Sequence, residues 1–416
     1  MSASLWRKVG FGLLLGAVIV FGLYMAVQAV DFSVYCSAAK QLLGHDYDLY
    51  RQGGLAFRYA PVIAFAFIPF SFLPLAAAAF LWYLLKIAAL IAIAGMVMKL
   101  MNLEDKHFWK ILVFSLLITG GYIVEEIHTG NIHFLVLFLI VLALFQVERG
   151  KIVFPSFLMA VAICIKVTPF LFLLYFALAR RWKICLFCFL WLAVLILAPG
   201  FFIGWEKNLD LAKNWMDTAV ARAEEPVNHS LNGVLFKYLT EKKMEPETEK
   251  YPRVNLLNLR VGIVKWIWLL TSALILFLLY KALLRKCGEK ECVALKYALL
   301  TVSLLLLSPH DSRIYFSTLF FPCAVLVAFL YKYSGSEFRA FLLSVLGLSF
   351  ILNTLLPALM PGRRASLVYE TLSPYFFSAL FIWIALWLVL CYSNPIYSRG
   401  FAMRRNRGAD PPRRDE

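Results

Sequence analysis

Charged residues are scarce in this chain of 416 residues: they make up 16% of it, whereas apolar residues make up 62%. Soluble domains contain about 45–50% apolar residues, and a water-soluble protein of this length could not bury such an excess. Apolar runs recur along nearly the whole length, which excludes a soluble domain carried on one anchor. The composition therefore predicts an all-α, polytopic membrane protein.

Paired cysteines are also lacking, because the eight cysteines show no spacing of the zinc or redox kind. We expect neither a metal site built on cysteine nor a disulfide framework. Acidic residues are few as well: 25 Asp and Glu against 41 Lys and Arg leave a net charge of +16. No basic patch is interleaved with aromatic residues on a soluble module, so we expect no nucleic-acid partner.

The basic residues instead gather in short clusters, as they do in the cytoplasmic loops of membrane proteins. The clusters are Arg180–Lys183, Arg285–Lys286 and the tail Arg399–Arg414. We expect residues 393–416 to be a disordered cytoplasmic tail that could bind anionic lipid headgroups.

Apolar runs of about 17–25 residues predict about twelve transmembrane helices in a single domain over residues 1–416. They lie near residues 11–30, 56–73, 76–98, 109–124, 131–147, 152–178, 184–204, 261–283, 293–308, 314–331, 338–356 and 375–392. The first run follows Arg7 and Lys8, and we interpret it as a retained helix with its amino terminus in the cytoplasm rather than a cleaved signal peptide. Alternation then places both termini inside, and the loops 31–60 and 205–260 outside.

One segment resists simple alternation. The run 109–124 is short and contains Gly120-Gly121, and the polar sequence Glu125–Asn131 follows it. Alternation places these polar residues on the cytoplasmic side. A half-depth or re-entrant helix would turn them into a cavity instead, which is tolerated where protein or water surrounds the backbone. The sequence leaves both possibilities open.

Asp31 follows the first predicted span, and the next residues predict an amphipathic helix along the membrane surface. A carboxylate at this boundary can act as a general base on a hydroxyl group, or it can be an ordinary charge at a helix end. Asp46-Tyr47-Asp48 has the spacing of a metal-binding carboxylate pair, but such pairs are more often solvated loop charges. Arg58 and Tyr59 close the loop as a phosphate ligand or as interfacial anchors.

Lys166 lies within the predicted span 152–178, three residues before Pro169. An ionisable group at this depth is costly and marks a functional site by default. A lipid-linked phosphate is one partner for it, and Glu125 or Glu126 is the structural alternative. In the outer loops, Asn228 and Ser230 carry groups that can bind sugar hydroxyls, while His310 and Arg313 can hold a phosphate or move a proton.

Together these segments resemble glycosyltransferase family 87, polyprenyl-phosphate-mannose-dependent mannosyltransferases of the multi-spanning C superfamily (GT-C). The resemblance rests on the order of several short motifs from residue 31 to about residue 330. They are Asp31 with Tyr35, Gly44 with Leu49-Tyr50, Tyr59-Ala60-Pro61, Leu73-Pro74 before Leu81-Trp82, His128–Asn131, Lys166–Pro169, Arg180–Trp182, Asn228–Ser230 and Ser308-Pro309.

The resemblance implies a GT-C-like helical bundle in a bacterial inner membrane with a periplasmic active site. Asp31 would be the catalytic base of an inverting transfer, and a polyprenyl-phosphate sugar, mannose, would be the donor, without metal or cofactor. Lys166, Arg58 and Arg313 are the candidates for binding the donor phosphate. Candidates for binding the sugar or a glycolipid or polysaccharide acceptor are Tyr35, Tyr59, His128, Asn131, Asn228, Ser230 and His310.

Two other functions fit the composition. A transporter or flippase of a lipid-linked saccharide would use Lys166 and a broken helix near Gly120 as a substrate pathway. A non-catalytic partner in envelope polysaccharide synthesis would need neither. Against the transporter, the sequence has no inverted halves, and the long polar loops share one face.

Overall fold

The computed structural model describes residues 16, 18–50, 57–218, 227–241, 251–285, 290–333 and 338–392. Within these ranges every regular element is a helix. The tail 393–416 and the basic residues Arg7 and Lys8 lie outside the described residues. Six of the described cysteines carry free thiols, whereas Cys292 is disulfide-bonded, which departs from the expectation at that position.

The amino-terminal half comprises α2 (Val30–Leu43), α3 (Pro61–Ala66), α4 (Ile68–Ser71), α5 (Leu75–Leu100), η1 (Asp105–His107), α6 (Phe108–Thr129), α7 (His133–Glu148), α8 (Val153–Ile165), α9 (Phe170–Leu178), α10 (Trp182–Leu197), α11 (Gly200–Ile203) and α12 (Trp205–Thr218). The remainder comprises α13 (Leu231–Leu239), α14 (Val261–Leu284), α15 (Lys290–Leu306), η2 (Arg313–Leu319), α16 (Phe320–Lys332), α17 (Arg339–Phe350), η3 (Ile351–Leu355), α18 (Leu356–Leu359), α19 (Gly362–Thr371) and α20 (Pro374–Tyr392). A further helix, Val18–Ala26, precedes α2 at a bend of 58°.

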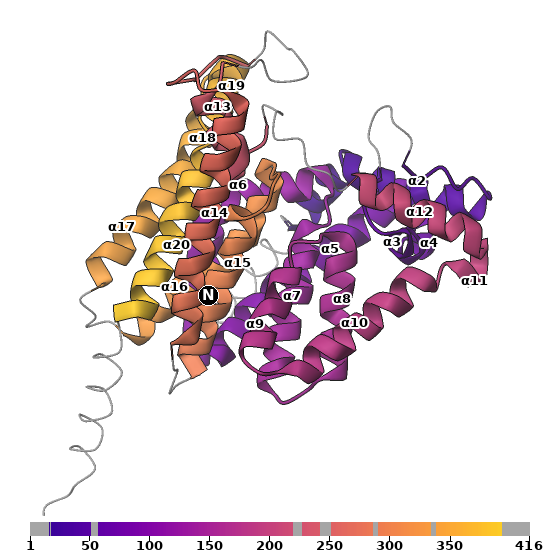
Figure 1. Cartoon of the computed structure of the whole chain (residues 1–416), viewed down its shortest axis with the longest axis horizontal. Helices are drawn as coiled ribbons and strands as arrows, with labels where there is room; N and C mark the ends of the chain where they lie inside the picture. Colours follow the sequence, from indigo (N-terminus) through magenta and orange to yellow (C-terminus); the bar gives the residue numbers. More distant parts are fainter. Residues whose placement is uncertain are drawn as a thin grey trace, which may run out of the picture.

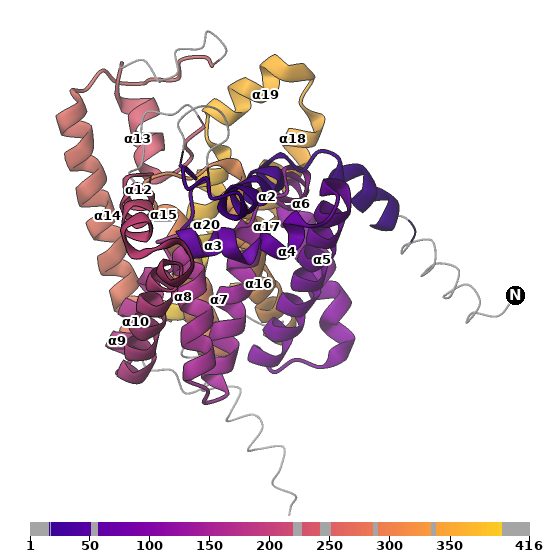
Figure 2. The same ribbon diagram turned by 90° about the vertical axis from the view of Figure 1, so that its right-hand side faces the viewer.

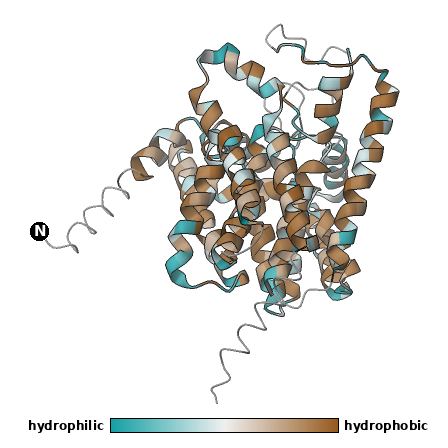
Figure 3. Ribbon diagram, turned by 90° about the vertical axis from the view of Figure 1, so that its left-hand side faces the viewer, coloured by the Kyte–Doolittle hydropathy of each residue, from teal (hydrophilic) through white to brown (hydrophobic). Residues whose placement is uncertain are grey.

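Long apolar helices form the body of the molecule. Among the described residues, seven are long and apolar enough to cross a membrane, or eight if the bent pair before and including α2 counts as one span. Polar residues gather at the two ends of the bundle, and apolar residues fill the band between them (Figure 3). The prediction of an all-α polytopic protein is therefore confirmed, whereas the number twelve is not.

The bundle has two groups of upright helices. One contains α14, α15, α16, α17 and α20, and the other contains α7, α8 and α9, with α10 inclined beside them (Figure 1). The short helices α2, α3, α4 and α12 lie across the upper end of the second group, while α13 and α19 rise at the same end of the first (Figures 1 and 2). The helix expected after Asp31 is present as α2, whose buried side includes Phe32 and Tyr35.

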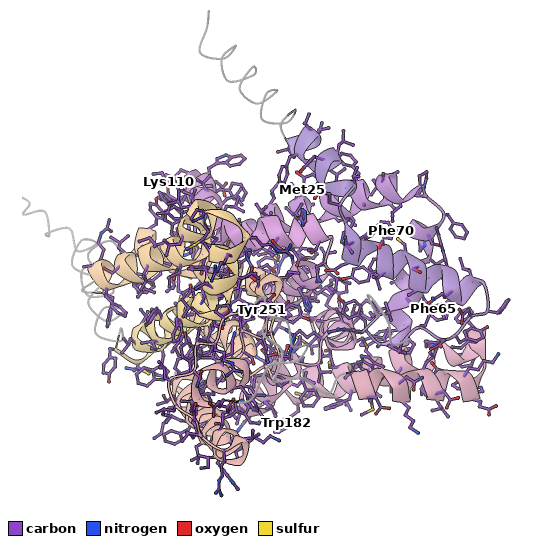
Figure 4. All side chains as sticks on the ribbon, turned by 90° about the horizontal axis from the view of Figure 1, so that it is seen from above. Met25, Phe65, Phe70, Lys110, Trp182 and Tyr251 are labelled. Atoms are coloured by element: carbon purple, nitrogen blue, oxygen red, sulfur yellow. The ribbon has the colours of Figure 1, made fainter. Side chains whose placement is uncertain are left out.

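The predicted span 56–73 is wrong, because this segment folds into the two short helices α3 and α4. Pro61 starts α3, Pro69 follows in the first turn of α4, and Pro74 ends the segment, so no stretch between these prolines is long enough to cross a bilayer. The segment packs beside α2 instead, with the Phe32 and Phe70 ring centroids 5.8 Å apart. Phe65 and Phe70 lie on one flank of the molecule seen from above (Figure 4).

The predicted span 152–178 is also wrong as a single crossing, because it forms the hairpin α8–α9. Lys166 has extended backbone angles after α8, and Pro169 cannot continue a helical hydrogen-bond ladder. The chain then turns back, since Arg181 after α9 lies 2.8 Å from Glu148 before α8. Both ends of the hairpin therefore lie at the same end of the bundle.

The segment 56–73 removes one predicted crossing, and the segment 152–178 turns back instead of crossing once. The predicted side of the membrane therefore changes for the residues between these two segments, whereas it stays the same for the residues after them. Without a span at 56–73, the turn after α6 lies at the end that holds α2, and Asn131 contacts Asp31 there. The turn is recessed, because Trp82, seven residues into α5, donates to the carbonyl of Gly130, and seven residues span about 10 Å. Of the two possibilities left open by the sequence, the contacts favour a turn enclosed by protein, because the segment Glu125–Asn131 packs against α2 and α5.

Cysteine accessibility tests this topology. Thr129→Cys and Asp48→Cys are expected to react with a membrane-impermeant maleimide from the same side of sealed vesicles, whereas Lys151→Cys and Glu104→Cys react only from the other side. The unsubstituted protein supplies the background from its own cysteines. Opposite sidedness of Thr129→Cys and Asp48→Cys would restore the simple alternation and refute the fold described.

Candidate active site

Asp31 is held in place by one residue of the α6–α7 turn. It lies in the first turn of α2 and is partly exposed, and Asn131 Nδ2 donates a hydrogen bond of 2.7 Å to Asp31 Oδ2. The other end of the Asn131 amide is also fixed, because its Oδ1 accepts from the backbone N–H groups of Ile132 at 2.8 Å and His133 at 3.2 Å. The carboxylate is thus oriented, and it keeps acceptor capacity for a further hydrogen bond.

The motif before Asn131 permits the close approach of α2. Gly130 has φ +71°, and a Cβ atom there would lie 2.8 Å from the Cβ atoms of Ala29 and Phe32. Only glycine accepts both the left-handed backbone and this contact. His128 strengthens the same junction, since its Nε2 is hydrogen-bonded to Gln28 Oε1 at 2.5 Å. His128 therefore joins α6 to the residues that precede α2.

Two tyrosines connect α2 to the segment around Lys166. The hydroxyl groups of Tyr35 and Tyr59 share a hydrogen bond of 3.0 Å, and both rings are buried. Burial raises the pKa of Tyr59 well above its usual value, and Tyr315 nearby adds to this. The next residue, Ala60, donates its N–H to the carbonyl of Cys164 at 2.9 Å. The first loop thereby reaches the end of α8, two residues before Lys166.

Lys166 pairs with neither Glu125 nor Glu126. Its Nζ lies 2.8 Å from Asp311 Oδ1 and 3.6 Å from the centroid of the Tyr315 ring. Asp311 is fully buried, whereas the Lys166 side chain is 19% exposed. Burial raises the pKa of Asp311, and the Lys166 ammonium opposes this. The Tyr315 ring also lies 3.8 Å from the ring of His133, so Lys166 lies close to the α6–α7 turn that holds Asp31.

A pocket extends from Lys166 into the apolar part of the bundle. Its lining comprises His133, Val136, Leu137 and Ile140 of α7, Lys166, Thr168 and Pro169 of the hairpin turn, Leu304 and Leu305 of α15, and Thr318 of η2. A cationic group beside aliphatic side chains suits a ligand with an anionic head and an apolar chain.

Asn228 and Ser230 assemble the loop that carries Asp311. Asn228 Oδ1 accepts from the N–H groups of Ser230 and Asp311, while Asn228 Nδ2 and Ser230 Oγ both donate to the carbonyl of Pro309. Ser230 also caps α13 by accepting from Gly233. The resemblance motifs Asn228–Ser230 and Ser308-Pro309 therefore meet, and their polar groups bind the protein itself.

Arg313 lies between two carboxylates. Its Nη1 is 3.8 Å from Glu125 Oε2 and 3.8 Å from Glu370 Oε1, and its guanidinium lies over the ring of Tyr375. These carboxylates compensate its charge, which makes Arg313 less suited than a lone cation to hold a phosphate. Arg58, the other arginine predicted to bind the donor phosphate, is exposed. His310, predicted to bind the sugar or the acceptor, is partly exposed and lies near Tyr315.

Asp46 and Asp48 form a local turn, in which the N–H of Asp48 donates to Asp46 Oδ1 at 3.2 Å. Across the part of the chain that the structure describes, no group of three or more His, Cys, Asp or Glu residues could hold a metal ion.

The sequence interpretation passed over Lys86 and did not separate the roles of Glu125 and Glu126. Lys86 Nζ lies 3.3 Å from Glu126 Oε1, and both side chains are buried. Lys86 stands in the middle of the predicted span 76–98, so the depth criterion that selected Lys166 also selects Lys86. His133 and Tyr315 carried no such signal, because a lone aromatic residue in an apolar run is most often a core residue.

The sequence profile of glycosyltransferase family 87 matches residues 57–309, more than half of the chain. This chain belongs to glycosyltransferase family 87. The family resemblance found in the motifs is thereby confirmed. The family match includes Asn131, Lys166 and Asn228 and begins after Asp31, so the placement of Asp31 rests on its contacts with the matched region.

A curated relative in Mycolicibacterium smegmatis is a polyprenol-phosphate-mannose-dependent alpha-(1-2)-phosphatidylinositol pentamannoside mannosyltransferase. It is 32% identical to this family 87 chain over 160 residues, which make up 37% of this chain and 38% of the relative. The aligned part thus spans well under half the length of the relative.

The buried pair of Lys166 and Asp311 predicts a stability difference between single and double variants. Lys166→Met leaves the Asp311 carboxylate buried without its cation, which is expected to cost up to about 3–5 kcal/mol, less here because Lys166 is partly exposed. Lys166→Met/Asp311→Asn removes both charges and is expected to recover most of the thermal stability measured in detergent. Lys213→Met, at an exposed lysine of α12, is the control; equal losses in the single and double variants would refute the pairing.

Proposed function

We propose that this protein is a membrane glycosyltransferase that moves a hexose, mannose, from a polyprenyl-phosphate sugar to a hydroxyl group of a glycolipid or polysaccharide. The reaction takes place at the end of the bundle that holds α2, which we assign to the periplasmic face of a bacterial inner membrane. Membership of family 87 supports the transferase class. The relative's name, which specifies a polyprenol-phosphate-mannose donor and a phosphatidylinositol mannoside acceptor, supports the donor and a lipid-linked acceptor.

The observation that carries this proposal is the placement of a fixed carboxylate and a cation at one end of the bundle. Asn131 holds Asp31 at 2.7 Å, and His133, two residues later, contacts the Tyr315 ring on which Lys166 lies. A base for the acceptor and a cation for the leaving phosphate are the two groups that this reaction needs.

In the proposed reaction Asp31 accepts the proton of the acceptor hydroxyl as its oxygen attacks the anomeric carbon. The bond from that carbon to the phosphate oxygen breaks, and the electron pair leaves with the polyprenyl phosphate. A single displacement of this kind inverts the anomeric centre. Asn131 prevents the Asp31 carboxylate from rotating away, because its own amide is bound to the backbone of α7.

Lys166 is the residue that we assign to the donor phosphate. Its ammonium is partly exposed and borders a pocket with five aliphatic side chains, so a phosphate beside the ammonium has apolar side chains next to it for the polyprenyl chain. Arg313 and Arg58 remain weaker candidates, since Arg313 is already paired with Glu125 and Glu370. The polyprenyl-phosphate sugar is a co-substrate, and the proposal includes no metal or other cofactor.

The transporter alternative loses one of its two supports. Helix α6 runs unbroken from Phe108 to Thr129 through Gly120 and Gly121, so the broken helix expected there is absent from this part of the chain. The interruption at Lys166–Pro169 lies in a hairpin that returns to its own side. It is not a discontinuous span of the kind that lines a transport pathway.

A transfer assay with purified protein tests the assignment of Asp31. With radiolabelled polyprenyl-phosphate-mannose and a membrane extract as the source of acceptor, Asp31→Asn is expected to lower the rate of transfer by about 100- to 10,000-fold. Asp210→Asn, an isosteric change at an exposed aspartate of α12, is expected to leave the rate unchanged.

Transfer that persists at the wild-type rate in Asp31→Asn would remove Asp31 from the mechanism. Movement of the labelled lipid across proteoliposome membranes without transfer of mannose would support the transporter instead.

A further inference from the structure

A buried ion pair lies directly beneath the turn that holds Asp31. Lys86 of α5 and Glu126 of α6 have exposed side-chain fractions of 2% and 1%, and their charged groups are 3.3 Å apart. Lys86 is eleven residues into α5, about 16 Å from its start. Charged side chains at such depth are costly in a membrane protein and are rarely present without a function.

The contacts of the pair fix both helix ends that meet at the turn. Lys86 Nζ donates to the carbonyl of Glu126 at 2.7 Å, which places a cation at the negative end of the α6 dipole. Glu126 Oε1 accepts the N–H of Phe134 at 3.1 Å, which places a carboxylate at the positive end of α7. The carbonyl of Glu126 also accepts the N–H of Asn131 at 3.2 Å.

The same two charges act on Asp31. Both Lys86 and Glu126 interact electrostatically with the Asp31 carboxylate, and Tyr35 and Tyr59 are further titratable side chains close to it. Asp31 therefore has one cation and one anion below it. Glu126 Oε2 is buried and has no hydrogen-bond partner among the described residues, so the Glu126 charge is balanced mainly by Lys86.

We propose that the Lys86–Glu126 pair is a positioning device for Asp31, which holds the α6–α7 turn through one hydrogen bond from each side chain to the backbone and balances the charge beside the carboxylate. Asn131 transmits the position, because its backbone binds Glu126 and its side chain binds Asp31. In the proposed mechanism the pair contacts neither the donor nor the acceptor. The proposal rests on the proposed function of Asp31 as the general base.

The two charges have opposite effects, and this separates the pair from a merely structural element. Glu126→Gln keeps an oxygen that can accept from Phe134 but removes the anion, so Lys86 favours the ionised form of Asp31. In the pH profile of kcat/KM for transfer, the fall in activity on the acidic side (the acidic limb) is then expected to move to lower pH. Lys86→Met leaves the anion uncompensated, and the limb is expected to move to higher pH. Each shift is expected to stay below about one pH unit, because the charges do not contact Asp31 directly.

Two further variants complete the experiment. Lys86→Met/Glu126→Gln contains no charge at this site and is expected to return the limb to near the wild-type position. Its kcat is expected to stay reduced by about 10- to 100-fold with the donor KM unchanged, because displacement of a reacting group by about 1 Å costs up to 100-fold. Lys86→Arg keeps the cation and is expected to retain the wild-type limb.

The outcomes are distinct from those of the function itself. Wild-type protein without transfer activity would refute the proposed function. The role of the pair would be refuted if the wild type is active but the acidic limb moves in the same direction in Glu126→Gln and Lys86→Met, or moves in neither variant. If Lys86→Met does not fold, Glu126→Gln and the double variant still test the role of the pair. The acidic limb is expected to shift to lower pH in Glu126→Gln and to return to near the wild-type position in the double variant.

Discussion

The hydrogen bond from Asn131 to Asp31 joins the two parts of the molecule on which the site depends. On one side are α2 and the first loop, which bring the carboxylate, Tyr35 and Tyr59. On the other is the recessed α6–α7 turn, which is anchored to α5 by Trp82 and Lys86. Gly130 permits the approach, since a side chain there would push α2 away. The position of this turn therefore sets the position of Asp31.

A polar turn can lie this deep only because its groups are satisfied within the protein. The carbonyl groups at the end of α6 accept from Trp82 and Lys86, and the first N–H groups of α7 donate to Asn131 and Glu126. One of the side chains that complete these hydrogen bonds, Asn131, also orients Asp31. Stability of the recessed turn and placement of the carboxylate therefore both depend on Asn131.

Much of the architecture could be predicted from the sequence, because a membrane imposes its own pattern of apolar runs. The helical class, a helix at Asp31 and the family were all recovered. Two segments were misassigned, because hydropathy does not show whether an apolar run continues in one direction. Prolines divide residues 56–73 into short helices, and the break at Lys166–Pro169 turns the chain back. The two errors together leave Arg181 and Arg285 on the same predicted side of the membrane. The distribution of basic residues therefore could not reveal either error.

The partners of the candidate residues could not be predicted in the same way. Lys166 was selected by its depth, but its partner Asp311 lies 145 residues away in sequence, and only the folded chain brings them together. Asn228 and Ser230 were chosen for groups that could bind a sugar, and in the fold these groups hold the loop of Asp311. The type of a side chain indicates which groups it can bind, whereas the group that it does bind depends on tertiary contacts.

If Asn131 acts through Asp31, a double-mutant cycle on kcat/KM for transfer will show it. Asn131→Ala is expected to lower kcat/KM in the wild-type background and to have little effect once Asp31→Asn is present, so that the two changes are strongly non-additive. Losses that simply multiply in the double variant would contradict it, since each residue would then act on its own.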